Sequence, residues 1–447
     1  MEFQLINQDG VYPNSIEIGS LSIFAPNLKS RIDLRIEIEN YLREKYKPGV
    51  YQGPAANEIS QYLFSFYNTE FKKNITLIDN PFFIYFTLFQ SDLASRIHNQ
   101  FRTNKLDKNQ ARYWEKNGPL FRRTLSYLLD EMILQFEFPN MPNQTFVESL
   151  IDFDRLFLLS EKAIEYSVIS NEIYYLNKSY KVKINPEGSE FFIESIKTKQ
   201  SKKYSQLHEY YVNQTSIDSS LREKYINGKP YEQDWIKHGS FLNNSFKTSV
   251  GLTYHEFMYL LTTICLSTNP INSEKDIPLV HKDEFFNDLS RQFDITKDQI
   301  NLFFDGLTLR KQHLDLNKRS FRKFKQSYRV GKRPFLEICK SDGTFLTWSN
   351  ELIKERLNFL DNDFIFKTLP SEWNNKTISL AVNRISNDAG KWFEAQVKYN
   401  LLQMGFFGDQ IKDKITSKNG GLNCLDVGGF EFMRNHQKGQ PATSILV

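Results

Sequence analysis

Two acidic residues near the C-terminal end of the sequence have the surroundings of metal ligands. Glu394 lies in Asp388–Met404, where apolar residues recur at helical spacing, and Asp426 lies near the end of the strand-like segment Leu422–Val427. Mg²⁺ prefers oxygen ligands and is typically held by one or two carboxylates together with waters and substrate phosphate. Such a metal can activate a water and neutralise charge on a phosphate. The pair therefore predicts a Mg²⁺ (or Mn²⁺) site for phosphodiester hydrolysis.

A helix and a hairpin must position these two acids. Asn387 and Asp388 are suited to cap the helix and Gly405 to end it, so that Glu394 borders an apolar stripe of Phe393, Val397, Leu401 and Met404. Gly428-Gly429 follows Asp426, and there the bare backbone could bulge or admit a ligand. Thr443–Val447 then begins a second apolar strand, so a hairpin with Leu422–Val427 is expected.

This order of helix, strand and hairpin strand resembles the PD-(D/E)xK, or restriction-endonuclease-like, superfamily, over the region from Ile378 to the end. The resemblance implies that Glu394 is the helical acid and Asp426 the central metal-binding aspartate. It also implies a Glu-x-Lys at or immediately after Val447, where the sequence has no residues. The resemblance implies that the intact protein is a metal-dependent DNA endonuclease with a role in bacterial restriction or defence. Without Glu-x-Lys we expect weak metal binding and little cleavage from this chain.

The ordinary interpretation of the same residues is structural. A Glu on an amphipathic helix is usually solvated, and an Asp before Gly-Gly is usually a turn residue. Glu337 and Lys340 do not supply the missing motif, because two strand residues at this spacing point to opposite faces. The alternative to a nuclease is therefore a non-enzymatic helical scaffold or a nucleic-acid-binding protein.

A second candidate site is a basic stretch between Arg310 and Arg333, in which Phe321, Phe324 and Tyr328 are interleaved with Lys and Arg. On a helix, the aromatic residues would pack and the basic residues would project outward. Such a strip could neutralise DNA phosphates, although a solvated face is the simpler interpretation. The residues proposed for phosphate contact are Arg319, Arg322, Lys323, Lys325 and Arg329.

Composition limits the other classes of function. The chain has 447 residues and a net charge of only +4, so any nucleic-acid surface must be local. Three widely spaced cysteines argue against a disulfide framework, and the N-terminus lacks the basic and apolar run of a signal peptide. We therefore expect a cytoplasmic protein without a membrane span. The histidines do not cluster, and no serine-hydrolase, phosphate-loop or dinucleotide motif is present.

The pattern of apolar residues predicts a mainly α protein. Capping boxes begin helices at Thr253–Glu256 and Thr296–Gln299, and two short hairpins are expected, at Tyr180–Ile196 and at Pro334–Trp348. We expect a helical N-terminal domain over 1–150 and a helical middle domain with the two hairpins and the basic strip over 151–370. A partial α/β restriction-endonuclease-like domain is expected over 375–447. A protein partner could bind the helical region.

Overall fold

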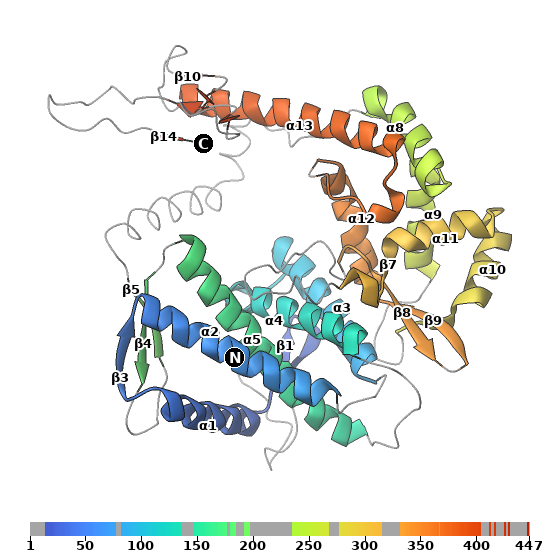
Figure 1. The fold of residues 1–447 in the computed structure, drawn as a ribbon. Coiled ribbons are helices and arrows are strands. Elements are labelled where there is room, and N and C mark those ends of the chain that lie inside the picture. The colour runs from blue at the N-terminus through green and yellow to red at the C-terminus, as the bar shows by residue number, and fades with distance from the viewer. Residues whose placement is uncertain are drawn as a thin grey trace, which may run out of the picture. The chain divides into compact units, whose positions relative to one another are not determined.

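A computed structural model of the chain describes residues 14–76, 82–135, 146–176, 179–184, 192–196, 235–267, 277–314, 331–340, 342–365 and 367–403, with five short strand pieces after residue 410. Of these residues 73% are helical, which confirms the mainly α expectation (Figure 1). The contacts divide the chain into two compact units, residues 1–202 with 250–359 and residues 203–249 with 360–447. No helix within the described ranges combines the length and apolar character needed to cross a bilayer.

The first unit begins with a bundle of long helices. They are α1 (Leu28–Lys45), α2 (Pro54–Thr76), α3 (Phe82–Arg102), α4 (Lys108–Gln135) and α5 (Phe146–Leu176). Apolar residues at helical spacing are buried in both α1 and α2: Leu34, Ile38 and Leu42 in α1, and Ile59 and Leu63 in α2. The stripes of these helices face a common hydrophobic core.

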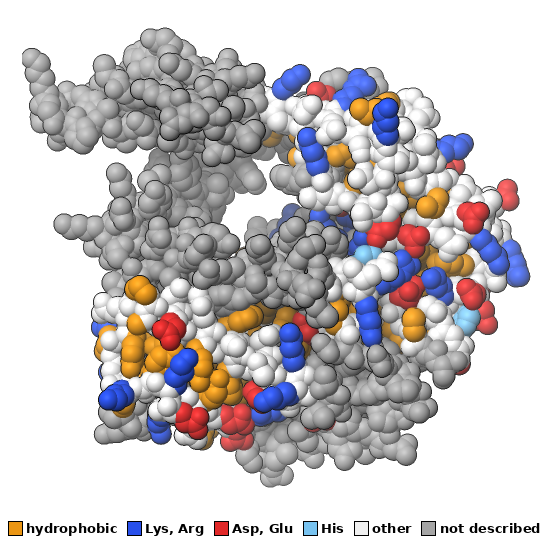
Figure 2. Space-filling model, in the orientation of Figure 1, with side chains coloured by type: hydrophobic (Ala, Val, Ile, Leu, Met, Phe, Trp, Pro, Cys, Tyr) orange, Lys and Arg blue, Asp and Glu red, His pale blue; other side chains and the backbone are white. Residues whose placement is uncertain are grey.

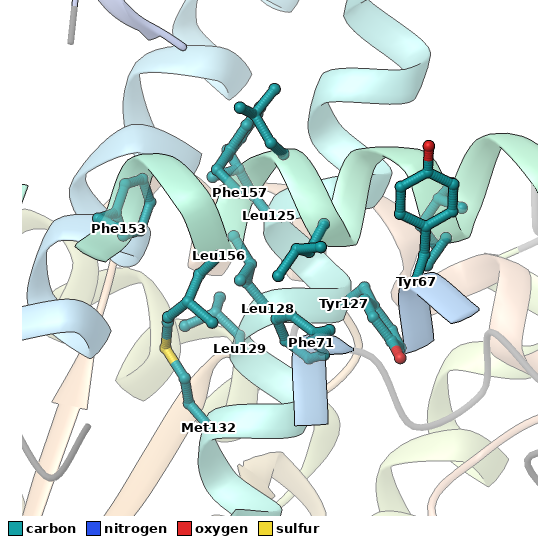
Figure 3. Packing of buried hydrophobic residues seen from close by; sticks show 14 of the residues in the cluster. Tyr67, Phe71, Leu125, Tyr127, Leu128, Leu129, Met132, Phe153, Leu156 and Phe157 are labelled. Atoms are coloured by element: carbon teal, nitrogen blue, oxygen red, sulfur yellow. The ribbon is translucent and has the colours of Figure 1, made fainter. Parts of the chain in front are cut away.

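This core is built from aromatic and aliphatic side chains of α2, α4 and α5 that point toward one another (Figure 3). Phe71, Leu128, Leu156 and Phe157 are all fully buried there. At its edge, Phe153 meets Phe24 edge-on with ring centroids 5.1 Å apart. Removal of so much apolar surface from water is the main source of stability for this bundle.

Two small sheets flank the bundle. The hairpin of β1 (Asn14–Ile18) and β2 (Leu21–Ala25) turns through Gly19, whose φ of 63° favours glycine. β3 (Gly49–Gln52), β4 (Ser179–Ile184) and β5 (Phe192–Ile196) form an antiparallel sheet in the order β3-β4-β5. The predicted hairpin around residues 180–196 is therefore confirmed.

The rest of the first unit combines helices with a four-stranded sheet. Its elements are α9 (Tyr254–Ser267), β6 (Leu279–His281), α10 (Lys282–Phe293), α11 (Lys297–Leu307), β7 (Thr308–Leu309), η2 (Lys311–His313), β8 (Phe335–Lys340), β9 (Gly343–Trp348) and the first part of α12 (Asn350–Ile365). The strand order is β6-β9-β8-β7, in which β7 and β8 are parallel and the other pairs antiparallel. The second predicted hairpin is thus confirmed as β8 and β9.

Both predicted capping boxes are present. Glu256 accepts from the backbone N–H of Thr253 at 2.7 Å, and the Thr253 hydroxyl accepts from the N–H of Glu256 at 3.2 Å. Thr296 and Gln299 make the same reciprocal contacts at the start of α11. Side chains therefore satisfy N–H groups that would otherwise lack a partner at both helix starts.

The second unit contains α8 (Trp235–Val250), η5 (Ser371–Trp373) and α13 (Lys376–Gln403), followed by β10 (Ile411–Lys412), β11 (Ile415–Thr416), β12 (Cys424–Leu425), β13 (Gly428–Gly429) and β14 (Ile445–Leu446). Phe246 of α8 lies between Phe364 and Trp373, with ring centroids 5.9 and 6.1 Å away. These rings, all buried, form the local core of this unit.

Candidate functional site

The helix that carries Glu394 begins earlier than the sequence analysis predicts. α13 starts at Lys376, and Asn375 caps it by accepting from the N–H groups of Thr377 and Ile378, both at 3.0 Å. The apolar stripe extends toward this end of the helix through the buried residues Ile378, Ala381, Val382, Ile385 and Ala389. The predicted cap at Asn387 and Asp388 is therefore wrong, because the buried stripe continues through the helix before that point.

Asp388 has a different partner in the second unit. Its Oδ2 lies 2.9 Å from Nε2 of His238 on α8, whose side chain is only 2% exposed. A carboxylate at this position orients the imidazole and joins α8 to α13 by a polar contact. Asp388 lies less than two turns before Glu394 in the same helix. The Glu394 side chain itself is not among those described.

After α13 come the strand pieces that surround Asp426. β12 pairs antiparallel with β11, and β13 pairs antiparallel with both β10 and β14. The predicted hairpin of Leu422–Val427 with Thr443–Val447 is wrong in its pairing: β12, inside the first segment, pairs with β11, and β14 pairs with β13, which follows that segment. Gly428-Gly429, expected to be a bulge or an open backbone, is part of this ladder. Asp426 itself lies outside the described residues, between β12 and β13.

The basic stretch is described only at its two ends, because Arg319, Arg322, Lys323, Lys325 and Arg329 lie outside the described residues. At the first end, Arg310 donates to Glu337 from Nε at 3.1 Å and to Asp305 from Nη1 at 3.0 Å. Lys282 donates to the other oxygen of Glu337 at 2.8 Å. Burial alone would raise the pKa of Glu337, but the Lys282 hydrogen bond and the Arg310 charge outweigh it and hold this pKa below its ordinary value.

At the other end of the stretch, Arg333 is buried and donates from Nη1 to the carbonyl oxygens of Asp305 and Thr308, at 2.8 and 3.3 Å. The expectation that the whole stretch forms one helix fails at its ends, where a short 3-10 turn (η2) follows Arg310 and β8 follows Arg333. Through Glu337 of β8 and the Thr308 carbonyl of β7, the two arginines hold the ends of the stretch against the parallel strands. They are structural anchors, so phosphate contact would fall to the basic residues between them.

One group of buried and partly exposed polar side chains among the described residues was not predicted. We call it the α3–α12 clasp: Asp92, Ser95 and Asn99 on α3, Arg122 on α4, and Ser349, Glu351, Lys354 and Glu355 at the start of α12. Asp92 accepts from the Ser349 hydroxyl at 2.8 Å and from the N–H of Glu351 at 3.2 Å. A buried carboxylate thus caps the N-terminus of α12, where the helix dipole favours negative charge.

Further along α3 and α12, two more carboxylates form hydrogen bonds between the same two helices. Glu355 accepts from the Ser95 hydroxyl at 2.7 Å and from Arg122, and Glu351 accepts from Asn99 at 3.1 Å. Lys354 donates to Glu351 at 2.5 Å. Each carboxylate therefore accepts at least one hydrogen bond from a different part of the chain.

Burial dominates the electrostatics of the clasp. It raises the pKa of Asp92, although the hydrogen bonds from Ser349 and Glu351 oppose the shift. Burial and, to a smaller extent, the positive charges of Arg122 and Arg102 together lower the pKa of the neighbouring His98 to about 4. The imidazole is therefore neutral near pH 7, beside guanidinium groups.

A sequence signal for the clasp does exist. Asp92, Ser95 and Asn99 follow the i, i+3, i+7 spacing of one helix face, within a helix that is otherwise rich in Phe and Leu. Ser349-Asn-Glu-Leu has the composition of a helix start. What no periodicity reveals is that these two segments, more than 250 positions apart, meet.

Among the described residues, no group of three or more His, Cys, Asp or Glu side chains could hold a metal ion. The side chains of Glu394 and Asp426 are not among these described residues. No protein-family model matches the chain, and searches of curated proteins and of solved structures found no match.

Proposed function

We propose that the C-terminal part of this chain belongs to a metal-dependent DNA endonuclease of the restriction-endonuclease-like class, acting in the cytoplasm. One observation carries the proposal: α13, which bears Glu394, is followed by antiparallel strand pieces on both sides of Asp426. The resemblance calls for this order of a helix with an acid and a hairpin with an acid on its first strand.

The chemistry of the two acids fits this role. Glu394 and Asp426 would hold Mg²⁺ or Mn²⁺, since hard cations take carboxylate oxygens. The bound metal would supply an activated water and neutralise phosphate charge. The basic residues between Arg310 and Arg333 would neutralise DNA phosphates.

The first test is Mn²⁺ binding to the full chain by isothermal titration calorimetry. We expect one weak site whose affinity falls about tenfold or more in Asp426→Asn and in Glu394→Gln, because each change removes a charged ligand. Asp288→Asn is the matched control, since the Asp288 side chain is 74% exposed and lies on α10. Equal Mn²⁺ affinity in all four proteins would overturn the proposed site.

Cleavage is tested separately by nicking of supercoiled plasmid in Mg²⁺ or Mn²⁺. The coding DNA after Val447 is read first, and any in-frame continuation with Glu-x-Lys is included in a second protein. Nicking by that protein that is lost in Asp426→Asn supports the endonuclease. DNA binding without metal dependence in either protein would instead favour the non-enzymatic nucleic-acid-binding alternative.

A further inference from the structure

A cluster of aromatic side chains remains partly exposed where α1, α2 and β3 meet. It consists of Tyr41 on α1, Tyr46 directly after α1, Tyr51 on β3, and Tyr62 and Phe66 on α2, all of intermediate exposure. Figure 2 shows hydrophobic side chains, the class that includes tyrosine, gathered over α1 and α2 at the lower left, with charged groups among them. Solvent therefore reaches these rings, unlike the aromatic rings of the bundle core.

Two of the rings form a corner. The rings of Tyr46 and Tyr62 have centroids 5.7 Å apart and planes at 80°, so they stand as two nearly perpendicular walls. Tyr41 stacks on Tyr62, with centroids 4.6 Å apart and planes at only 10°, and Tyr51 meets Tyr46 edge-on at 5.8 Å. Because a further tyrosine supports each wall, the corner has little freedom to lose when a ligand binds.

An ammonium group already lies in this corner. Nζ of Lys45 is 3.9 Å from the centroid of the Tyr62 ring and 5.5 Å from that of the Tyr46 ring, within the range of cation–π contacts. Within the described part of the chain, this ammonium makes no hydrogen bond or ion pair. The two tyrosine rings are therefore the groups that attract it.

A carboxylate lies beside the same corner. The Tyr46 hydroxyl donates to Oε1 of Glu58 on α2 at 3.3 Å, and Glu58 is exposed. A negative charge at this position attracts a cation in the corner without covering either ring face. The site thus combines two aromatic walls with an acid, which is a set of groups that binds cations.

This arrangement suits a quaternary ammonium better than the lysine that it holds. A primary ammonium is strongly hydrated, and it gives up part of that hydration on a ring face. A quaternary ammonium instead surrounds its charge with methyl groups, which pack on aromatic rings. Lys45 is exposed at the last residue of α1 and leaves the rings by rotation of its own side chain. It is therefore a weak occupant that a better cation can displace.

We infer that Tyr46 and Tyr62 form a binding site for a quaternary ammonium group of the choline type, which the Lys45 side chain occupies in the absence of that ligand. The inference goes beyond the proposed function and does not depend on it, because the corner lies in the first unit and uses neither Glu394 nor Asp426. Affinity should depend both on the positive charge of the ligand and on the ring faces.

The test measures choline binding to the full chain by saturation-transfer difference NMR of the choline methyl protons, in EDTA and at constant ionic strength. We expect saturable binding. The neutral isostere 3,3-dimethylbutanol, which has the same shape without the charge, should bind about threefold to tenfold more weakly. Absence of choline binding, or equal affinity for the two compounds, would overturn the inference.

Variants of one wall test the role of the ring. Tyr62→Leu should weaken choline binding by about threefold to tenfold, because leucine is apolar but has no ring face. Tyr62→Phe keeps the ring and should bind choline as the unaltered chain does. Tyr259→Leu is the matched control, since Tyr259 is 66% exposed on α9 and should not change the affinity. Equal losses in the two leucine variants would mean that choline contacts exposed tyrosines in general, and the inference would be wrong.

Lys45→Ala distinguishes a displaceable occupant from a structural cation. Alanine is compatible with the helix and removes the competing ammonium, so choline should bind about twofold to fivefold more tightly. An affinity that is unchanged or lower in this variant contradicts the inference. Because Lys45→Ala leaves both rings in place, this result holds even if Tyr62→Leu fails to fold.

A second probe identifies the source of the ammonium group. The chain is sedimented with vesicles of phosphatidylcholine, and vesicles of phosphatidylglycerol, which lack a quaternary ammonium, are the control. Sedimentation that requires both phosphatidylcholine and Tyr62 assigns a lipid headgroup, whereas choline binding without it assigns a free small molecule. If neither probe binds, the inference fails, and the Mn²⁺ titration of Asp426→Asn still decides the endonuclease proposal on its own.

Discussion

The first unit joins its helices in two contrasting ways. The core between α2, α4 and α5 is apolar, with Leu128, Leu156 and Phe157 fully buried. The α3–α12 clasp buries carboxylates and hydroxyls instead, and Asp92 and Ser349 are as inaccessible as the core residues. Apolar burial stabilises in proportion to area, whereas a buried ion pair must first offset the desolvation of its charges. The core should therefore dominate stability, and the clasp should determine which segments meet.

The largest effect should come from the core. Phe157→Ala removes a fully buried ring that packs against Phe24 and Phe121, with ring centroids 5.2 and 5.3 Å away. It should lower the free energy of unfolding by about 3–5 kcal/mol, through lost transfer energy and the cavity left behind. Urea denaturation followed by circular dichroism measures the loss. Ile36→Ala, at a residue 51% exposed on α1, should change it by less than about 0.5 kcal/mol.

The second effect tests the buried cap in the clasp. Asp92→Ala should cost about 2–3 kcal/mol, because the Ser349 hydroxyl and the Glu351 N–H lose their acceptor inside the protein. Asp92→Asn keeps an acceptor and should cost about 1 kcal/mol. Hydrogen exchange should show faster opening of the first turn of α12 in the alanine variant. A loss for Asp92→Ala as large as that for Phe157→Ala would erase the contrast between core and clasp.

The same contrast explains what the sequence could predict. The apolar stripe of Leu34, Ile38 and Leu42 can be recognised in the sequence because a buried helix face repeats every 3.6 residues. The helix caps at Thr253 and Thr296 can be recognised in the sequence because the two residues that form each capping box lie within four positions of each other. The partners of Asp92 and Ser95 lie more than 250 positions away, and nothing local identifies them.

The candidate site follows the same rule. The partner of the last strand was misplaced by a few residues, because the apolar segment Leu422–Val427 looked like the first hairpin strand, whereas Gly428–Gly429 after it pairs with β14. The start of α13 was misplaced because Asp388, which looks like a helix cap in sequence, is bound by His238 from a distant helix. Arg310 and Arg333 looked like members of one basic surface, but Glu337, Asp305 and two backbone carbonyls bind them. Tertiary partners changed the role of each of these residues.

A third prediction uses pH. Burial and neighbouring arginines lower the pKa of His98 to about 4 in the folded protein, from 6.5. The unfolded chain therefore binds more protons between these values, so stability is full above pH 6.5 and falls as pH drops toward 4. Because His98 is only partly buried, we expect a loss of about 1–2 kcal/mol, well below the unscreened limit of about 3.4 kcal/mol.

The pH effect is checked by urea denaturation at several pH values in this window. His98→Gln should flatten the dependence, since glutamine does not titrate. Asp92 acts in the opposite sense: its raised pKa makes stability fall as pH rises through the acidic range just above 3.8. An unchanged slope in His98→Gln would show that other groups cause the pH dependence.

The smallest effects decide whether burial matters to the clasp at all. A double-mutant cycle of Ser95→Ala and Glu355→Gln should give a coupling energy of about 0.5–1.5 kcal/mol, because water is largely excluded from that hydrogen bond. The exposed pair of Lys73 and Glu70 on α2, 2.7 Å apart, should give about 0.2–0.5 kcal/mol in the cycle of Lys73→Met and Glu70→Gln. Equal couplings would mean that the surrounding protein does not strengthen the clasp. The hydrogen bonds of the clasp would then contribute no more to stability than ordinary surface contacts do.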